Sequence, residues 1–418
     1  PGFATGGGLA YRRPEPRAGW GPRFRASARA RAGAGLIAGR RDAICRPYRR
    51  SEGAWTMFAE LGFETLTPRA ASVWSGLGLG LLFGALAEVT RFCLRRAVAG
   101  APAERPGARG VWLTALAVAV LAVQGAVAAG WITFADHRFL AADLPWLSIL
   151  AGGVMFGAGM VLARGCVSRL TVLTGTGNLR AALVLLVIAV VAHAAMKGVL
   201  APLRTALGAV TLPLGDAASL AALPGGAGLW AGLIAVACLA VAARSGARPR
   251  DLGLAAGIGL LVAAGWVGTG VVLLDEFDPI AMESLAFTAP VADTLFWSIA
   301  ATSIPAGFGT GLVGGVLAGA FAAALLGGRL RWQGFEGPRQ TGRYLAGGAL
   351  MGAGGVLAGG CTVGAGLSGV PTLSVAALLA LGAIVLGARA TAAALGEPTR
   401  PSAGSAGSRT TRPALPAE

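Results

Sequence analysis

The hydrophobic pattern of the chain consists of long apolar runs separated by short polar loops. A transmembrane helix needs about 20 mostly apolar residues, and nine runs meet or approach that length. They cover about 72–93, 111–134, 146–163, 179–200, 227–243, 251–274, 307–327, 343–359 and 372–393. The runs lack the short alternating segments of barrel strands, and only helices or closed barrels satisfy their backbone in lipid. The pattern therefore predicts an all-α polytopic membrane protein with about nine transmembrane helices.

Composition supports this prediction. Of the 418 residues, 55% are hydrophobic and only 13% are charged, whereas a soluble protein has roughly 25% charged residues. The net charge of +16 is uneven, because residues 1–56 carry +9 of it through twelve arginines and three acidic residues. We expect this basic head to be disordered sequence upstream of a start at Met57, the first methionine. A basic cytoplasmic or nucleic-acid-binding tail is the alternative, and we expect no nucleic-acid partner.

The charges of the loops predict an orientation, since Lys and Arg concentrate in cytoplasmic loops. Loops 95–110, 244–250 and 328–343 are rich in arginine, whereas loop 275–293 holds five acidic residues and no basic one. Nine crossings satisfy all four loops when the N-terminus lies outside and the C-terminus lies in the cytoplasm. We therefore expect a multi-pass protein of the bacterial inner membrane.

One segment of fifteen residues occurs twice. Residues 152–166 read GGVMFGAGMVLARGC and residues 347–361 read GGALMGAGGVLAGGC, so ten positions are identical. The copies lie in the third and eighth runs, and this odd separation gives them opposite orientations, as in the inverted repeats of transporters. The predicted parts are therefore the head 1–56, a first membrane half 57–243 with Gly-Cys at 165–166, a second half 244–395 with Gly-Cys at 360–361, and a disordered tail 396–418.

Each copy is followed by a break rich in Gly, Ser and Thr, at 167–178 and 362–372. Irregular backbone at membrane depth is tolerated where it lines a cavity or is buried in protein. We predict that Asn178 and Thr372 cap the helices that follow, because their side chains suit that position. Helix N-termini directed at the midplane favour an anion. The repeat thus predicts two Gly-Cys helix breaks near the midplane beside an anion path.

The five cysteines differ in their expected roles. Cys166 and Cys361 end the two repeats and are the strongest functional candidates, whereas Cys93 fits packing and function equally well. Cys45 and Cys238 fit the role of small hydrophobic residues. The chain has no CxxC pair, no His/Cys cluster with metal spacing and no nucleotide-binding fingerprint, so we expect no metal and no cofactor.

Charged residues near the first repeat allow two interpretations. Arg164 and Arg169 flank the first repeat's cysteine, where they either attract an anion or mark the cytoplasmic side. Glu88 lies inside the first apolar run, and we expect it to form a local ion pair with Arg91 or Arg95.

With these residues in view, the chain resembles the YeeE/YedE family of sulfur-transport membrane proteins. The resemblance lies in FGAGMVLARGCVSRLTVLTGTGNLRA, in LAGGCTVGAGLSGVPTLS, in TRFCLRRAV and in ESLAFTAPVADTL, and it extends over 72–395. It implies an inverted-repeat fold with a constricted centre and a path lined by cysteines that handle thiosulfate through S–H hydrogen bonds. The implied pathway residues are Cys93, Cys166, Cys361, Ser168, Arg169, Thr362, Ser368 and Asn178, with the helix-break glycines Gly165, Gly360, Gly364 and Gly366.

This resemblance implies transport of thiosulfate or a related sulfur anion, not catalysis. Thiols and backbone N–H groups attract a soft dianion moderately, and conduction requires binding weak enough for release. The first motif has Cys-Val-Ser-Arg where the second has Cys-Thr-Val-Gly, so Ser168 and Arg169 are expected to affect selectivity. Beside the sulfur anion and the lipid bilayer, a small soluble sulfur-carrier protein is a further partner to consider.

Two other hypotheses remain open from the sequence. The first is a membrane sulfur carrier, similar to a sulfurtransferase, in which a cysteine takes up sulfur as a persulfide. The second is a structural subunit of a larger complex, in which the cysteines only pack.

Overall fold

The computed structural model describes residues 66–275, 278–334 and 337–396. The predicted head 1–56 lies outside these residues, as does the predicted tail after residue 396. The helices of the first part of the described chain, with one short strand, are α2 (Pro68–Thr90), α3 (Leu94–Ala99), α4 (Arg105–Ala128), η1 (Arg138–Leu140), β1 (Asp143–Leu144), α5 (Trp146–Leu162), α6 (Val167–Gly175) and α7 (Leu179–Lys197).

The elements of the remaining described chain follow in the same alternation of long and short helices. They are α8 (Ala201–Gly208), β2 (Leu212–Pro213), η2 (Gly215–Ala218), η3 (Leu220–Ala222), α9 (Gly226–Ala243), α10 (Pro249–Val267), η4 (Gly268–Val272), α11 (Thr288–Ile299), α12 (Phe308–Leu326), α13 (Pro338–Leu357), η5 (Thr362–Gly369), η6 (Val370–Thr372) and α14 (Val375–Ala394). The strands β1 and β2 pair antiparallel and hold only two residues each.

The prediction of an all-α polytopic membrane protein is confirmed. Within the described ranges, nine helical segments are long and apolar enough to cross a membrane, and one falls in each predicted run. The structure adds helices that the apolar pattern did not indicate. The largest is α11, which lies partly within the predicted acidic loop and packs against α7 and α12.

The order of the long helices explains how one chain forms two inverted halves. Four crossings (α2, α4, α5 with α6, and α7) precede α9, and four more (α10, α12, α13 with η5, and α14) follow it. Because a single crossing separates the two sets, the second set runs in the opposite direction. The packing is reciprocal: α2 contacts α12 as α10 contacts α4, and α5 contacts α14 as α13 contacts α7.

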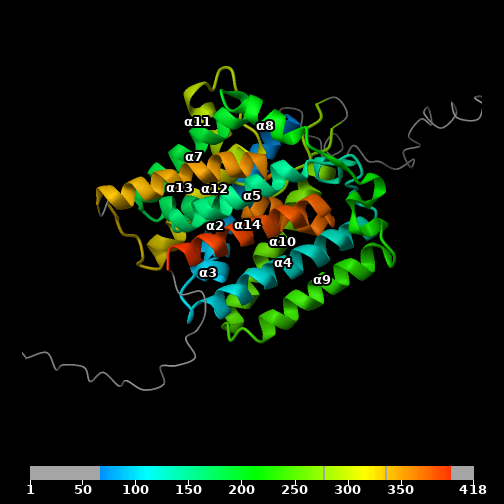
Figure 1. The fold of residues 1–418 in the computed structure, drawn as a ribbon, viewed down its shortest axis with the longest axis horizontal. Coiled ribbons are helices and arrows are strands. Elements are labelled where there is room, and N and C mark those ends of the chain that lie inside the picture. The colour runs from blue at the N-terminus through cyan, green and yellow to red at the C-terminus, as the bar shows by residue number, and fades with distance from the viewer. Residues whose placement is uncertain (1–65, 276–277, 335–336, 397–418) are drawn as a thin grey trace, which may run out of the picture. The chain divides into compact units, whose positions relative to one another are not determined.

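Glycines set the distance between α5 and α13, which lie side by side at the centre of this arrangement (Figure 1). Gly152 near the start of α5 faces Ala358, just after α13, and Gly159 faces Gly347, so the helices are antiparallel. A Cβ on Gly159 would lie 2.5 Å from the carbonyl oxygen of Gly347. The repeated glycines thus allow direct backbone contact between the two copies of the repeat, as small residues do between membrane helices.

Candidate functional site

The three cysteines singled out from the sequence share one local geometry. Cys93, Cys166 and Cys361 are the N-cap residues of α3, α6 and η5, and each has an extended backbone conformation. Much of each predicted break is therefore a short helix that starts at the cysteine. The first turn of a helix leaves backbone N–H groups without helical partners, and in the second motif Gly364 N donates to Cys361 Sγ at 3.3 Å.

The structure brings these cysteines together. The thiol of Cys93 lies beside that of Cys166, and Cys361 is near Cys166 as well. The residues expose only 4%, 1% and 1% of their surface, respectively. We call this buried group of three cysteines the thiol centre; it includes the cysteine of each Gly-Cys motif. Cys238 lies apart from these helices, on α9, and Cys45 lies outside the described residues.

Two hydroxyl residues predicted from the motifs lie at the thiol centre. Ser168 Oγ is 3.3 Å from Cys166 Sγ. Thr362 faces Cys166 from the second motif, but its buried Oγ1 has no hydrogen-bond partner among the described groups. Thr288, the first residue of α11, is a third buried hydroxyl and likewise lacks a partner in the described part of the chain. Thr288 lies in neither Gly-Cys motif, and its neighbour Phe287 contributes a backbone group beside Cys361.

Aromatic rings close the space around the thiol centre. Phe83 packs edge-on against Phe92, with 6.1 Å between ring centroids, and contacts Phe287 at 5.3 Å. Phe92 precedes Cys93, and Phe287 precedes Thr288. All three rings are buried, so they shield the thiols from solvent.

A cavity of about 560 Å³ leads toward the thiol centre from the side of the acidic loop. Its lining includes Gly364 and Ser368 of η5, so Cys361, which accepts a hydrogen bond from Gly364, lies directly behind it. Ser368 donates to Leu285 O at 2.7 Å, and its own carbonyl oxygen accepts from Trp266 Nε1 at 3.2 Å. Both residues were predicted from the second motif, and here they form one wall of the entrance.

Charged groups surround the mouth of this cavity. Arg138 and Glu283 both line it. Burial raises the pKa of the Glu283 carboxyl, and the nearby Arg138 opposes this rise. Burial also lowers the pKa of Arg138, against the effect of Glu283. The pKa of His137 falls to about 4 through burial and the charge of Arg138, so His137 is neutral near neutral pH and Arg138 supplies the positive charge.

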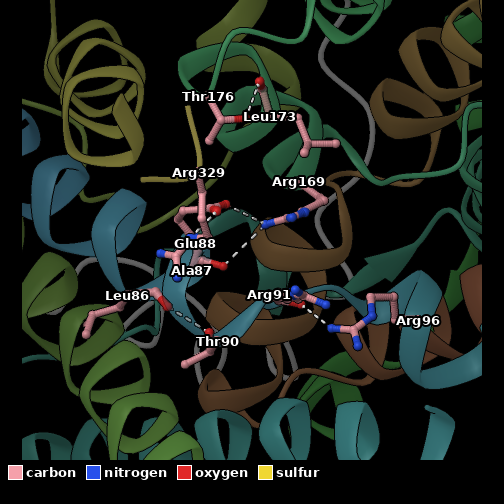
Figure 2. Close-up of polar contacts among 10 residues, drawn as sticks. All are labelled: Leu86, Ala87, Glu88, Thr90, Arg91, Arg96, Arg169, Leu173, Thr176 and Arg329. Atoms are coloured by element: carbon pink, nitrogen blue, oxygen red, sulfur yellow. Dashed lines mark hydrogen bonds and ion pairs between the residues drawn. The ribbon is translucent and has the colours of Figure 1, made fainter. Parts of the chain in front are cut away.

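The other side of the thiol centre carries a second charged cluster, which corrects the expected pairing of Glu88. Figure 2 shows Arg169 and Arg329 approaching its carboxylate from two sides. Arg169 Nη1 lies 3.3 Å from Oε2, and Arg329 Nε lies 3.5 Å from Oε1. Neither partner is Arg91 or Arg95, because Arg169 belongs to α6, directly after the Gly-Cys motif, and Arg329 to the loop after α12.

The predicted helix caps were half correct. Asn178 Oδ1 accepts from Ala181 N at 3.0 Å and caps α7 as expected, while its amide nitrogen donates to Gln333 Oε1 at 2.7 Å. Thr372 does not cap the last helix, because its hydroxyl donates to Gly369 O instead. Ser374 is the cap of α14 and accepts from Ala377 N at 3.2 Å. The left-handed backbone of Leu373 extends the turn by two residues, which no sequence pattern indicated.

The backbone at the two helix breaks differs between the two motifs. The left-handed residues are Arg164 and Gly359, one position before Gly165 and Gly360. A non-glycine residue is uncommon in that conformation, so Arg164 adopts a strained backbone beside the first cysteine. Glycine is needed at position 360 for a different reason: the backbone of Ala365 packs against it, and a Cβ there would lie 2.8 Å from Ala365 N. Gly366, the remaining predicted glycine, lies against the ring of Trp112.

A second internal repeat in the sequence could have indicated the charged clusters. Residues 88–93 read EVTRFC and residues 283–288 read ESLAFT. Their offset is 283 − 88 = 195, equal to the Gly-Cys offset of 361 − 166 = 195. At this offset Glu88 corresponds to Glu283 and Cys93 to Thr288, although only the Glu and Phe of the two segments are identical and Glu283 lies outside a helix.

These observations define a multi-pass membrane protein with a buried polar centre between two inverted halves. The family model described as sulphur transport matches residues 89–390, which include all three cysteines of the thiol centre. The chain therefore belongs to the sulphur transport family, and its role is that of a sulfur-related transporter. No curated protein sequence matches the chain.

Proposed function

We propose that the protein carries thiosulfate, or a closely related sulfur anion, across the bacterial inner membrane along a path lined by the thiol centre. The observation that carries this proposal is the convergence of Cys93, Cys166 and Cys361, each at the start of a short helix. Thiols donate weak hydrogen bonds, and the N-termini of helices present partial positive charge to an anion. Together these groups attract a soft anion without binding it irreversibly.

The unpaired hydroxyls support the same interpretation. A buried polar group without a hydrogen bond costs about 1–3 kcal/mol, and Thr288 and Thr362 both lack partners within the described residues. Their hydroxyls flank the cysteines and can donate to the oxygens of a passing anion.

Direction follows from the charges at the two ends. The cavity with Arg138 and Glu283 lies on the side of the acidic loop, which we assign to the outside. The arginine-rich loop that contains Arg329 then lies in the cytoplasm. Under this assignment the cavity is the outer entrance, and the Glu88 cluster lies toward the inner end.

Uptake into liposomes tests the proposal. The full chain is purified, reconstituted and assayed for uptake of radiolabelled thiosulfate, with Cys361→Ala as the variant and Cys238→Ala as the matched control. Cys238 is also a buried cysteine, but it lies on α9 away from the thiol centre. We expect uptake by the wild type and by the control, and a loss of about 5- to 150-fold for Cys361→Ala, since removal of one buried hydrogen-bond donor costs about 1–3 kcal/mol.

Two results would contradict the proposal. Absence of uptake by the reconstituted wild type, in vesicles where a known thiosulfate transporter is active, would exclude this substrate. Equal uptake by both cysteine variants would show that the thiol centre only packs.

A further inference from the structure

The carboxylate of Glu88 lies between two arginine side chains that could also bind a free anion. Its two oxygens contact different arginines, Oε2 with Arg169 and Oε1 with Arg329. Glu88 is buried in α2, with its side chain 9% exposed, and the Arg169 side chain is 14% exposed. Charged groups at such positions in a membrane protein are costly and mark ion or substrate pathways. Arg169 also follows Ser168, which contacts the first cysteine, so the cluster adjoins the thiol centre.

Backbone hydrogen bonds fix the loop that supplies Arg329. Arg331 N donates to Thr176 O, Gln333 N donates to Gly177 O at 3.1 Å, and Leu179 N donates to Gln333 O at 3.1 Å. The loop is thereby attached to the end of α6, the helix that begins at Cys166. Arg329 and Arg169 are consequently held on the same short helix-and-loop unit, with Glu88 reaching them from α2.

The outer end contains an equivalent set of groups in a different arrangement. Glu283 corresponds to Glu88 through the shared offset of 195 residues. Arg138 lies in the connection from α4 to α5, and Arg329 in the equivalent connection from α12 to α13. Glu283 and Arg138 line the cavity, whereas Glu88 and Arg329 are in contact. The carboxylate thus lies beside an open space at one end and in an ion-pair cluster at the other, each with an arginine from the corresponding connection but not from the same position.

We propose that Arg169 and Arg329 form an inner binding site for the transported oxyanion, and that Glu88 occupies this site while the inner end is closed. This inference rests on the proposed function, because it assigns the last site before release. An anion that passes the thiol centre displaces the carboxylate and takes over its contacts with both guanidinium groups. When the anion leaves, Glu88 returns and closes the site.

Competition between Glu88 and the substrate solves a problem of release. Arg169 is mostly buried, whereas the Arg329 side chain is 43% exposed. Together they would hold a dianion strongly, because Coulomb interactions increase where water is excluded. A resident carboxylate reduces this affinity by the free energy of its own ion pairs. The exit then attracts the anion from the neutral thiol centre but does not trap it.

Binding and transport by charge-neutral variants test this site. Thiosulfate binding to the purified full chain is measured by calorimetry, and KM and maximal rate are measured in liposomes. For Glu88→Gln we expect thiosulfate to bind about tenfold more tightly or better, because removing a competing charge pair changes affinity by at least about one factor of ten. We also expect a lower maximal rate of transport. For Arg329→Gln we expect binding that is weaker by a similar factor.

Glu104→Gln provides a matched control. Glu104 forms an ion pair with Arg96 at the same N–O distance, 3.3 Å, but its side chain is 54% exposed and no other described ion pair involves it. This variant removes the same charge without touching Arg169 or Arg329, so affinity and rate are expected to equal those of the wild type.

The opposite signs of the two main effects distinguish a binding site from a structural cluster. If Glu88→Gln binds thiosulfate with wild-type affinity, the carboxylate is not a competitor and the inference fails. If Glu88→Gln does not fold, Arg329→Gln decides the matter, and unchanged binding by that variant also refutes the site. Uptake by the wild type with loss in Cys361→Ala would leave the proposed function intact in either case, whereas absence of wild-type uptake and binding would reject both.

Discussion

The close contact of α5 with α13 predicts that one added methyl group disrupts the protein. In Gly159→Ala the new Cβ would lie 2.5 Å from Gly347 O and 2.9 Å from Met351 N. Ordinary contact begins at 3.4 Å, so the helices must separate by about 3.4 − 2.5 = 0.9 Å. The obstacle is backbone, which cannot rotate away. Overpacking of this kind costs about 1–3 kcal/mol, and the rigid contact places this substitution in the upper half of that range.

A matched glycine separates this effect from helix propensity. Gly232 lies in the middle of α9 and has no atom within 4 Å of the position that a Cβ would take. Alanine is favoured over glycine in helices by about 1 kcal/mol, a gain that both variants share. The free energy of unfolding of Gly159→Ala should therefore lie about 2–3 kcal/mol below that of Gly232→Ala. At about 2 °C per kcal/mol for a large domain, the melting temperatures should differ by about 4–6 °C.

Thermal unfolding of both purified variants in detergent, followed by intrinsic fluorescence, provides the measurement. Thiosulfate uptake gives a second readout, because separation of α5 from α13 moves the two Gly-Cys segments apart. Uptake should decrease for Gly159→Ala and not for Gly232→Ala. Equal melting temperatures would refute the argument that direct backbone contact holds these helices.

Three further predictions concern the site and its entrance. Cys361→Ser, which keeps a hydrogen-bond donor, should retain more thiosulfate uptake than Cys361→Ala; equal uptake would show that the donor is irrelevant. If the path conducts an intact anion, mass spectrometry after incubation with thiosulfate should show no gain of one sulfur atom on the protein, whereas such an adduct would favour the persulfide carrier. Burial lowers the pKa of His137 from 6.5 to about 4, so the unfolded chain binds more protons between these values and stability falls as pH decreases from 6.5 to 4. The melting temperature of His137→Gln should decrease less over this range, and parallel curves would exclude His137 as a cause.

The membrane segments could be predicted because their signal is local. Each apolar run must satisfy its backbone as a helix whatever its neighbours are, and all nine runs correspond to helices. The repeat likewise identified Cys166 and Cys361 before any contact was known. Cys93 could not be distinguished from a packing residue, because its role depends on its position beside Cys166. That proximity arises from tertiary packing, which periodicity does not encode.

The errors share this physical origin. Glu88 was assigned to the nearest arginines in sequence, but its partners come from α6 and from the loop after α12. The spacing of residues along a helix predicts contacts between side chains three or four positions apart. It does not predict contacts with a second helix. Thr372 was a reasonable cap by residue type, yet the chain continues through a left-handed residue to Ser374. Arg164 adopts a left-handed backbone conformation that glycine usually adopts, so tertiary contacts can also override the conformational preference of a residue.

The two halves share a fold but differ in the residues that face the centre. At the offset of 195 residues, Cys93 corresponds to Thr288, and Arg169 corresponds to Gly364. Gly364 forms part of the cavity wall and offers only a backbone N–H to Cys361, whereas Arg169 brings a full charge next to Cys166. On the proposed path, an anion at the centre therefore meets a backbone donor at Gly364 on one side and the Arg169 cation, paired with Glu88, on the other. In the proposed inner site, this exchange of glycine for arginine supplies the attraction for the anion, and the ion pair with Glu88 keeps that attraction weak enough for release.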